Sequence, residues 1–85
     1  MEGDWYIDDD GWMARRAVKR FNTDPPMQEC VEIVSPTGRV IENMLSSSHV
    51  GWGGVSGSAL DVPLQVCLAA YRGDESIYQE EGSDG

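Results

Sequence analysis

The sequence predicts a small α+β domain in which a central antiparallel β-hairpin, residues 29–44, is covered by two helices at about 11–21 and 62–72. Three observations lead to this fold class. Two segments rich in Val and Ile flank a turn sequence, two other segments space their apolar residues with a helical period, and a chain of 85 residues can bury only one small core. We therefore treat residues 1–85 as a single domain.

The hairpin is predicted by the turn sequence Ser35-Pro36-Thr37-Gly38 between its two strands. Proline presets φ for the turn, and glycine adopts the left-handed backbone that returns the chain. A three-residue loop with a bulge at Gly38 predicts four cross-strand pairs, which are Val34 with Val40, Ile33 with Ile41, Glu32 with Glu42, and Val31 with Asn43. Because two strands alone are marginally stable in water, the rest of the chain must cover them.

The segment 11–21 is predicted to be a helix because its apolar and basic residues separate at 100° per residue. A strand would mix charged and apolar side chains on one face. The apolar arc consists of Met13, Ala14, Ala17, Val18 and Phe21. Asp10 would cap this helix, and Asn22 with Pro25-Pro26 would end it. The alternative is a longer hairpin that turns at Asp9-Asp10-Gly11.

The segment 62–72 is predicted to be a largely buried helix lying across the hairpin. Asp61 is placed to cap it, Pro63 lies in its first turn and Gly73 follows its end. Its only polar stripe contains Asp61, Gln65 and Arg72. The alternative is a strand with Leu64, Val66, Leu68 and Ala70 on one side.

The remaining segments are predicted from composition. Residues 1–4 form a frayed N-terminus, and Trp5-Tyr6-Ile7 is a short strand or an apolar anchor. Residues 45–60 form a Gly/Ser-rich loop that is either functional or pairs in part as an irregular strand. Residues 74–85 form an acidic, disordered tail.

Composition excludes several classes of protein. No apolar run reaches the length of a membrane span, and the acidic N-terminus differs from a signal peptide, so we expect a cytoplasmic protein that does not bind membranes. Cys30 and Cys67 are expected to be reduced and buried. With a single histidine they do not complete a zinc site, so we expect no metal and no cofactor.

No catalytic or phosphate-binding motif is present. The glycines between Gly51 and Gly57 lack the GK[ST] sequence of a phosphate-binding loop and its strand-to-helix context. Ser46, Ser47 and Ser48 precede the only histidine, His49, but no orienting acid or nucleophile elbow accompanies them. We therefore expect that the protein is not an enzyme.

Acidic residues are the leading candidates for a binding site. The formal net charge is −9, and a negative surface attracts a protein with a basic surface. The candidate residues are Asp8, Asp9, Asp10, Glu32 and Glu42, with Trp52 and Trp12 as apolar anchors. Like charges opposite each other across strands cost stability, so the predicted pair of glutamates suggests a function other than folding. The alternative without a binding site is that the negative charge only keeps the protein soluble.

Two other functions remain open. A basic helix could bind nucleic acid, with side chains that grip phosphates and an indole that stacks on a base. The residues for this alternative are Trp12, Arg15, Arg16, Lys19 and Arg20. The net negative charge opposes it. A small structural or assembly subunit, whose loop and tails order on contact, is the other alternative.

In size and acidity the chain resembles the small phage or mobile-element proteins that inhibit host nucleic-acid enzymes by occupying their basic clefts, some of them by imitating DNA. This resemblance is one of composition, and it implies an inhibitor without assigning any residue to a site.

Overall fold

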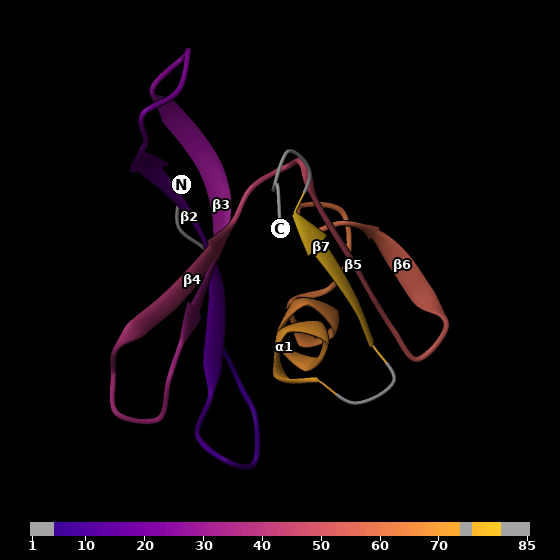
Figure 1. The fold of residues 1–85 in the computed structure, drawn as a ribbon. Coiled ribbons are helices and arrows are strands. Elements are labelled where there is room, and N and C mark those ends of the chain that lie inside the picture. Colours follow the sequence, from indigo (N-terminus) through magenta and orange to yellow (C-terminus); the bar gives the residue numbers. More distant parts are fainter. Residues whose placement is uncertain (1–4, 74–75, 81–85) are drawn as a thin grey trace.

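The computed structural model describes residues 5–73 and 76–80 as a mostly β structure with one short helix (Figure 1). A four-stranded antiparallel sheet, sheet A, has the order β1-β2-β3-β4, and a three-stranded antiparallel sheet, sheet B, has the order β6-β5-β7. The elements are β1 (Tyr6–Ile7), β2 (Met13–Arg20), β3 (Met27–Val34), β4 (Val40–Met44), β5 (Ser48–Trp52), β6 (Val55–Ser58), α1 (Leu64–Arg72) and β7 (Ser76–Glu80). No helix in these two described ranges is long and apolar enough to cross a membrane.

The predicted fold class, a hairpin covered by two helices, is wrong. The segment 11–21 is not a helix, because Met13–Arg20 forms β2 and pairs with both β1 and β3. The chain turns at Asp9-Asp10-Gly11, as in the alternative of a longer hairpin, and Gly11 has a φ of 90°. Asp10 therefore caps no helix.

The sequence of β2 does not alternate between apolar and polar residues, because side chains on both faces of the strand are buried. Ala14 faces α1 and Ala17 faces the opposite side, and both are fully buried. The charged side chains between them are held by partners within the protein. Arg15 bonds a carboxylate on β3, and Arg16 donates to the carbonyl oxygen of Val62 at 2.7 Å. Burial and pairing of this kind override the pattern from which we predicted a helix.

The hairpin of β3 and β4 is present, but its register differs from the prediction after the first pair. Val34 pairs with Val40 as expected, and then Ile41 is bulged, so that the observed pairs are Ile33 with Glu42, Glu32 with Asn43, and Val31 with Met44. A slip of one residue exchanges the two faces of a strand. The bulge turns Met44 into the core, where it is fully buried, and separates the two glutamates that we predicted to face each other.

The Gly/Ser-rich segment 45–60 is not a loop throughout, since most of it forms the hairpin of β5 and β6. Trp52 pairs with Val55 on either side of Gly53-Gly54, whose φ angles are 62° and 85°. Positive φ at both central residues is the geometry of a two-residue hairpin turn. Of the predicted acidic tail 74–85, residues 76–80 form β7 beside β5; the rest, and the predicted frayed residues 1–4, lie outside the described residues.

The second predicted helix is present as α1, two residues shorter at its start. Pro63 is its N-cap residue and no side chain caps it, so the predicted capping role of Asp61 is wrong. Gly73 follows the helix with a φ of 125° and donates its backbone N–H to the carbonyl oxygen of Ala69 at 2.9 Å. The predicted polar stripe of Asp61, Gln65 and Arg72 is exposed.

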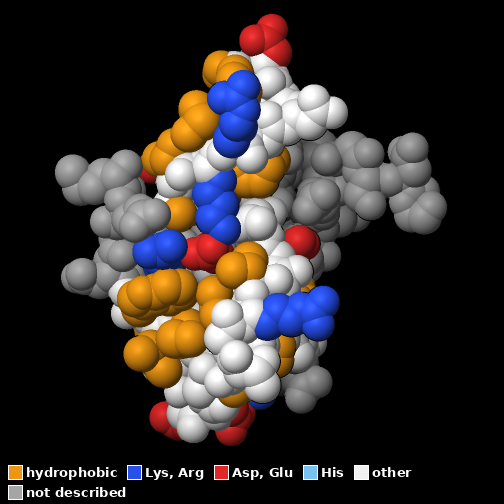
Figure 2. All heavy atoms as spheres, turned by 90° about the vertical axis from the view of Figure 1, so that its left-hand side faces the viewer, with side chains coloured by type: hydrophobic (Ala, Val, Ile, Leu, Met, Phe, Trp, Pro, Cys, Tyr) orange, Lys and Arg blue, Asp and Glu red, His pale blue; other side chains and the backbone are white. Residues whose placement is uncertain are grey.

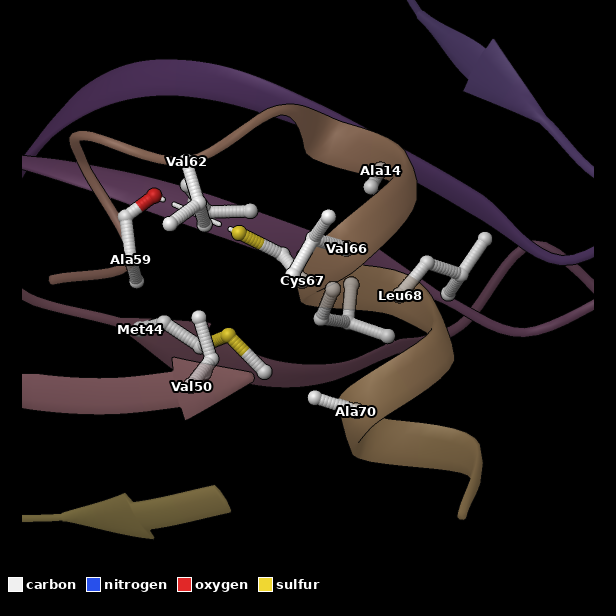
Figure 3. Close-up of a cluster of buried hydrophobic side chains, with 11 residues drawn as sticks. Ala14, Met44, Val50, Ala59, Val62, Val66, Cys67, Leu68 and Ala70 are labelled. Carbon is white, nitrogen blue, oxygen red and sulfur yellow. Dashed lines mark hydrogen bonds between the residues drawn. The ribbon is translucent and has the colours of Figure 1, made fainter. Parts of the chain in front are cut away.

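The core lies where α1 packs between the two sheets (Figures 1 and 3). Sheet A contributes Ala14, Val31, Ile33 and Met44, sheet B contributes Val50, and α1 with the segment before it contributes Ala59, Val62, Val66, Cys67, Leu68 and Ala70. Figure 3 shows Met44 and Val50 facing the side chains of α1. The helix therefore joins the two sheets into one hydrophobic core.

Both cysteines are free and buried, as expected from the sequence. The Cys67 thiol donates to the carbonyl oxygen of Ala59 at 3.2 Å (Figure 3). Burial raises the pKa of Cys67 to about 11, so this thiol is neutral at physiological pH and serves as a small apolar core residue.

Candidate functional site

The acidic turn, which we define as Asp8, Asp9 and Asp10, connects β1 to β2. One carboxylate oxygen of Asp8 accepts the backbone N–H groups of Asp10 and Trp12, each at 2.9 Å. The backbone of Asp8 also donates to the carbonyl oxygen of Trp12 at 2.9 Å. Asp8 therefore holds the shape of the turn, while Asp9 and Asp10 lie exposed at its tip.

Arg72 at the end of α1 joins the acidic turn to the helix. Its guanidinium donates to Asp8 at 2.5 Å and to Asp10 at 2.8 Å. It also lies over the ring of Trp12, with 5.4 Å between its central carbon and the ring centroid. Trp12 in turn packs against Tyr71, with ring centroids 6.2 Å apart. Trp12 is thus part of the junction between sheet A and α1.

The charges of this junction are mutually stabilised. Partial burial by itself raises the pKa of Asp8, but hydrogen bonds from Arg72 and from two backbone N–H groups outweigh it, and the pKa of Asp8 is lowered. Hydrogen bonds to Asp10 and Asp8 raise the pKa of Arg72. The pair of Asp8 and Arg72 therefore remains charged at neutral pH.

A pocket of about 180 Å³ opens beside the acidic turn. Four of its lining residues, Gln65, Leu68, Ala69 and Arg72, come from α1. These positions follow the i, i+3, i+4, i+7 spacing of one helix face. The other lining residues are Asp8 and two aromatic residues from different sheets, Tyr6 of β1 and Trp52 of β5.

Among the predicted partner-binding residues, the fold brings Asp8, Asp9, Asp10 and Trp52 to this region. Trp52, at the end of β5, is 39% exposed. Trp52 and Asp8 are 44 positions apart in the sequence, yet both line the pocket. Glu32 on β3 and Glu42 on β4 are not among the residues that line the pocket.

Glu32 is buried, which its predicted role as an exposed binding residue did not anticipate. Its side chain is 5% exposed and accepts hydrogen bonds from Arg15 at 2.8 Å and from Lys19. Figure 2 views sheet A from the side turned away from α1, and it shows acidic and basic side chains next to each other on this face. Burial alone would raise the pKa of Glu32, but the hydrogen bonds from Lys19 and Arg15 outweigh it and lower that pKa.

The basic residues of the nucleic-acid alternative do not form one surface. Because β2 is a strand, Arg15 and Lys19 project to one face of sheet A, while Arg16 and Arg20 project to the other. Arg15 also lies over the Trp5 ring at 4.6 Å. Arg16 bonds the carbonyl oxygen of Val62, and Trp12 packs at α1. The basic helix face predicted for nucleic acid is therefore wrong.

The structure adds five pocket residues that were not among the predicted site residues, namely Tyr6, Gln65, Leu68, Ala69 and Arg72. The helical spacing from Gln65 to Arg72 was a usable signal, since it defines the face of α1 that meets the acidic turn. Tyr6 had no comparable signal, because its position depends on the pairing of β1 with β2.

No group of three or more metal-ligating side chains gathers within the described ranges. Comparison of the chain with protein-family models, with curated proteins and with solved structures found no match in any of the three.

Proposed function

We propose that the protein binds the basic surface of another protein through its acidic turn, with Trp52 as an apolar anchor. The observation that supports this proposal is that most basic side chains are bonded within the protein, whereas the acidic residues are in excess. Four of the six basic residues bond to groups within the protein, since Arg15 and Lys19 hold Glu32, Arg16 bonds a carbonyl oxygen, and Arg72 holds Asp8 and Asp10. The acidic residues outnumber the bases fifteen to six, so the surface is left with an excess of negative charge.

The acidic turn remains negatively charged even though Asp8 and Asp10 pair with Arg72. Three carboxylates and the single guanidinium of Arg72 give the turn a formal charge of −3 + 1 = −2. Asp10 remains 66% exposed although it is paired. Exposed charges of one sign accelerate the approach of an oppositely charged partner and orient it.

Trp52 supplies contact area that charge alone lacks. A tryptophan that becomes buried near the centre of an interface is a frequent source of binding energy, because it buries a large apolar surface and loses little conformational entropy. Its position at the pocket beside the acidic turn places apolar and charged contacts together. This arrangement favours a protein partner over simple solubility.

A nucleic-acid enzyme is the kind of partner that fits this chemistry, since its binding cleft is lined by Lys and Arg side chains. A protein that occupies such a cleft acts as an inhibitor. The free, buried thiols of Cys30 and Cys67 support a reducing compartment such as the cytoplasm for this interaction.

The proposal is tested by parallel capture from nuclease-treated lysate of the source organism with three baits. The baits are the wild-type chain, the variant Asp9→Asn with Asp10→Asn, and the variant Asp24→Asn with Glu29→Gln. Both variants remove two exposed negative charges, but the second removes them at the far end of the β2–β3 hairpin. Asp8 is kept because it holds the turn.

We expect a protein that is retained by the wild type and by the Asp24/Glu29 variant, lost from the Asp9/Asp10 variant, and released by high salt. The same set of captured proteins with all three baits would contradict the proposal, because binding would then not depend on the acidic turn.

A further inference from the structure

The pocket beside the acidic turn has the size of one side chain. Its volume of about 180 Å³ is below the roughly 300–1,000 Å³ of pockets that hold cofactors and drug-sized ligands. An apolar cavity of about 150 Å³ is large enough for a benzene molecule. A single large aliphatic or aromatic side chain therefore fills the space.

The lining is suited to an apolar occupant. Four of the lining residues, Tyr6, Trp52, Leu68 and Ala69, offer aromatic or aliphatic surface. Leu68 is also part of the hydrophobic core, so its side chain is held by packing. Asp8 and Arg72, which form an ion pair, also line the pocket.

The surrounding charge identifies those flanking residues. The acidic turn carries a formal charge of −2, as derived above, and its tip at Asp9 and Asp10 is exposed. Lysine or arginine next to the inserted side chain complements this charge, whereas aspartate or glutamate is repelled.

We infer that the pocket receives one large apolar side chain, of the size of Leu, Met or Phe, from a segment of the partner protein in which lysine or arginine residues flank that side chain. This inference rests on the proposed function and specifies the partner's binding segment. Trp52, as a lining residue, then contacts the inserted side chain.

The test uses an isotope-labelled full chain and synthetic pentapeptides, followed by NMR chemical shifts. The first probe is acetyl-Lys-Lys-Leu-Lys-Lys-amide. The second replaces its leucine by alanine, and the third replaces its four lysines by glutamates. We expect the first probe to give saturable shifts at the Trp52 indole and at the amides of Leu68 and Ala69, and the alanine probe to bind about tenfold more weakly, because it buries less apolar area.

Three protein variants distinguish binding in the pocket from general electrostatic attraction. Ala69→Met places a long side chain in the pocket from a helix position that tolerates it, and it should remove the preference for leucine over alanine. Ile41→Met adds no bulk near the pocket, because Ile41 lies on the exposed bulge of β4, and it should keep that preference. Trp52→Ala should weaken the leucine probe while the alanine probe changes little.

Equal binding of the leucine and alanine probes, or shifts confined to residues away from Trp52 and α1, would overturn the pocket inference. If the lysine probes still bound better than the glutamate probe, the proposed function would stand without it. A preference for leucine with no preference for lysine over glutamate would instead overturn the basic partner, and with it both proposals.

Discussion

At the scale of single residues, Glu32 explains why the charges of β2 did not reveal a strand. Its buried carboxylate, on the face of sheet A turned away from α1, bonds Arg15 and Lys19. Both bases lie on the facing strand, and Arg15 is directly opposite Glu32 in the register. The buried carboxylate can bond both bases only in one pairing register of β2 and β3, so it favours that register.

We predict that Glu32→Gln lowers the free energy of unfolding at pH 7 by about 1–3 kcal/mol, because it removes the buried negative charge that accepts hydrogen bonds from Arg15 and Lys19. The matched control is Glu29→Gln, which removes the same charge from an exposed position on the same strand. It should change the free energy of unfolding by less than about 0.5 kcal/mol. Urea denaturation measures both values.

The effect of Glu32→Gln should depend on pH in one direction. The folded state lowers the pKa of Glu32, so its stabilisation is complete above the ordinary glutamate pKa of about 4.3 and is lost as pH falls through the lowered value. The difference between wild type and Glu32→Gln should therefore shrink between pH 5 and pH 3. An equal difference at both pH values would contradict the role of the ionised carboxylate.

At the scale of elements, local signals predicted the β3–β4 turn and the end of α1 correctly, whereas the helical period at 11–21 was misleading because Met13–Arg20 is a strand. The turn at Gly38, with a φ of 86°, and the end of α1 at Gly73 depend on the backbone freedom of glycine and could be predicted from the sequence. The bulge at Ile41 could not, because it is favoured by burial of Met44 against a core that includes the distant α1. The Gly53-Gly54 turn was a missed signal, since two glycines between Trp52 and Val55 are typical of a hairpin.

Within the β5–β6 hairpin, Gly51 is required by close contact across the strands. A Cβ atom at this position would lie 2.9 Å from the Cβ of Ser56 and 3.3 Å from the carbonyl oxygen of Val55. We predict that Gly51→Ala lowers the free energy of unfolding by about 1–3 kcal/mol through this overlap. Thermal or urea unfolding measures the loss.

A double-mutant cycle with Ser56→Gly identifies the cause. Removing the Ser56 side chain removes the nearest atom, so Gly51→Ala should cost about 1 kcal/mol less in that background. If Gly51→Ala costs the same in both backgrounds, contact with Ser56 is not the reason for glycine at this position.

At the scale of the whole molecule, composition predicted an acidic chain with one small core. It did not predict which charged residues are exposed and which are paired within the protein. The acidic turn and Trp52 were candidates from the sequence, and the fold places Asp8 and Trp52 on one pocket through β1, β5 and α1. We predicted that Glu32 and the basic residues of β2 would bind partners at the surface. In the structure, most of them form hydrogen bonds within the protein. The pairing of a charge depends on contacts between strands, which no local pattern in the sequence records.

Amide hydrogen exchange of the chain, alone and saturated with the protein captured by the wild-type bait, tests the central claim most directly. We predict slower exchange at residues 6–12, at Trp52 and along α1, with little change in β4 at the opposite edge of sheet A. Slower exchange confined to β4 and the face of sheet A turned away from α1, with the acidic turn and α1 unchanged, would contradict binding at the acidic turn and would favour an assembly subunit that associates through sheet A.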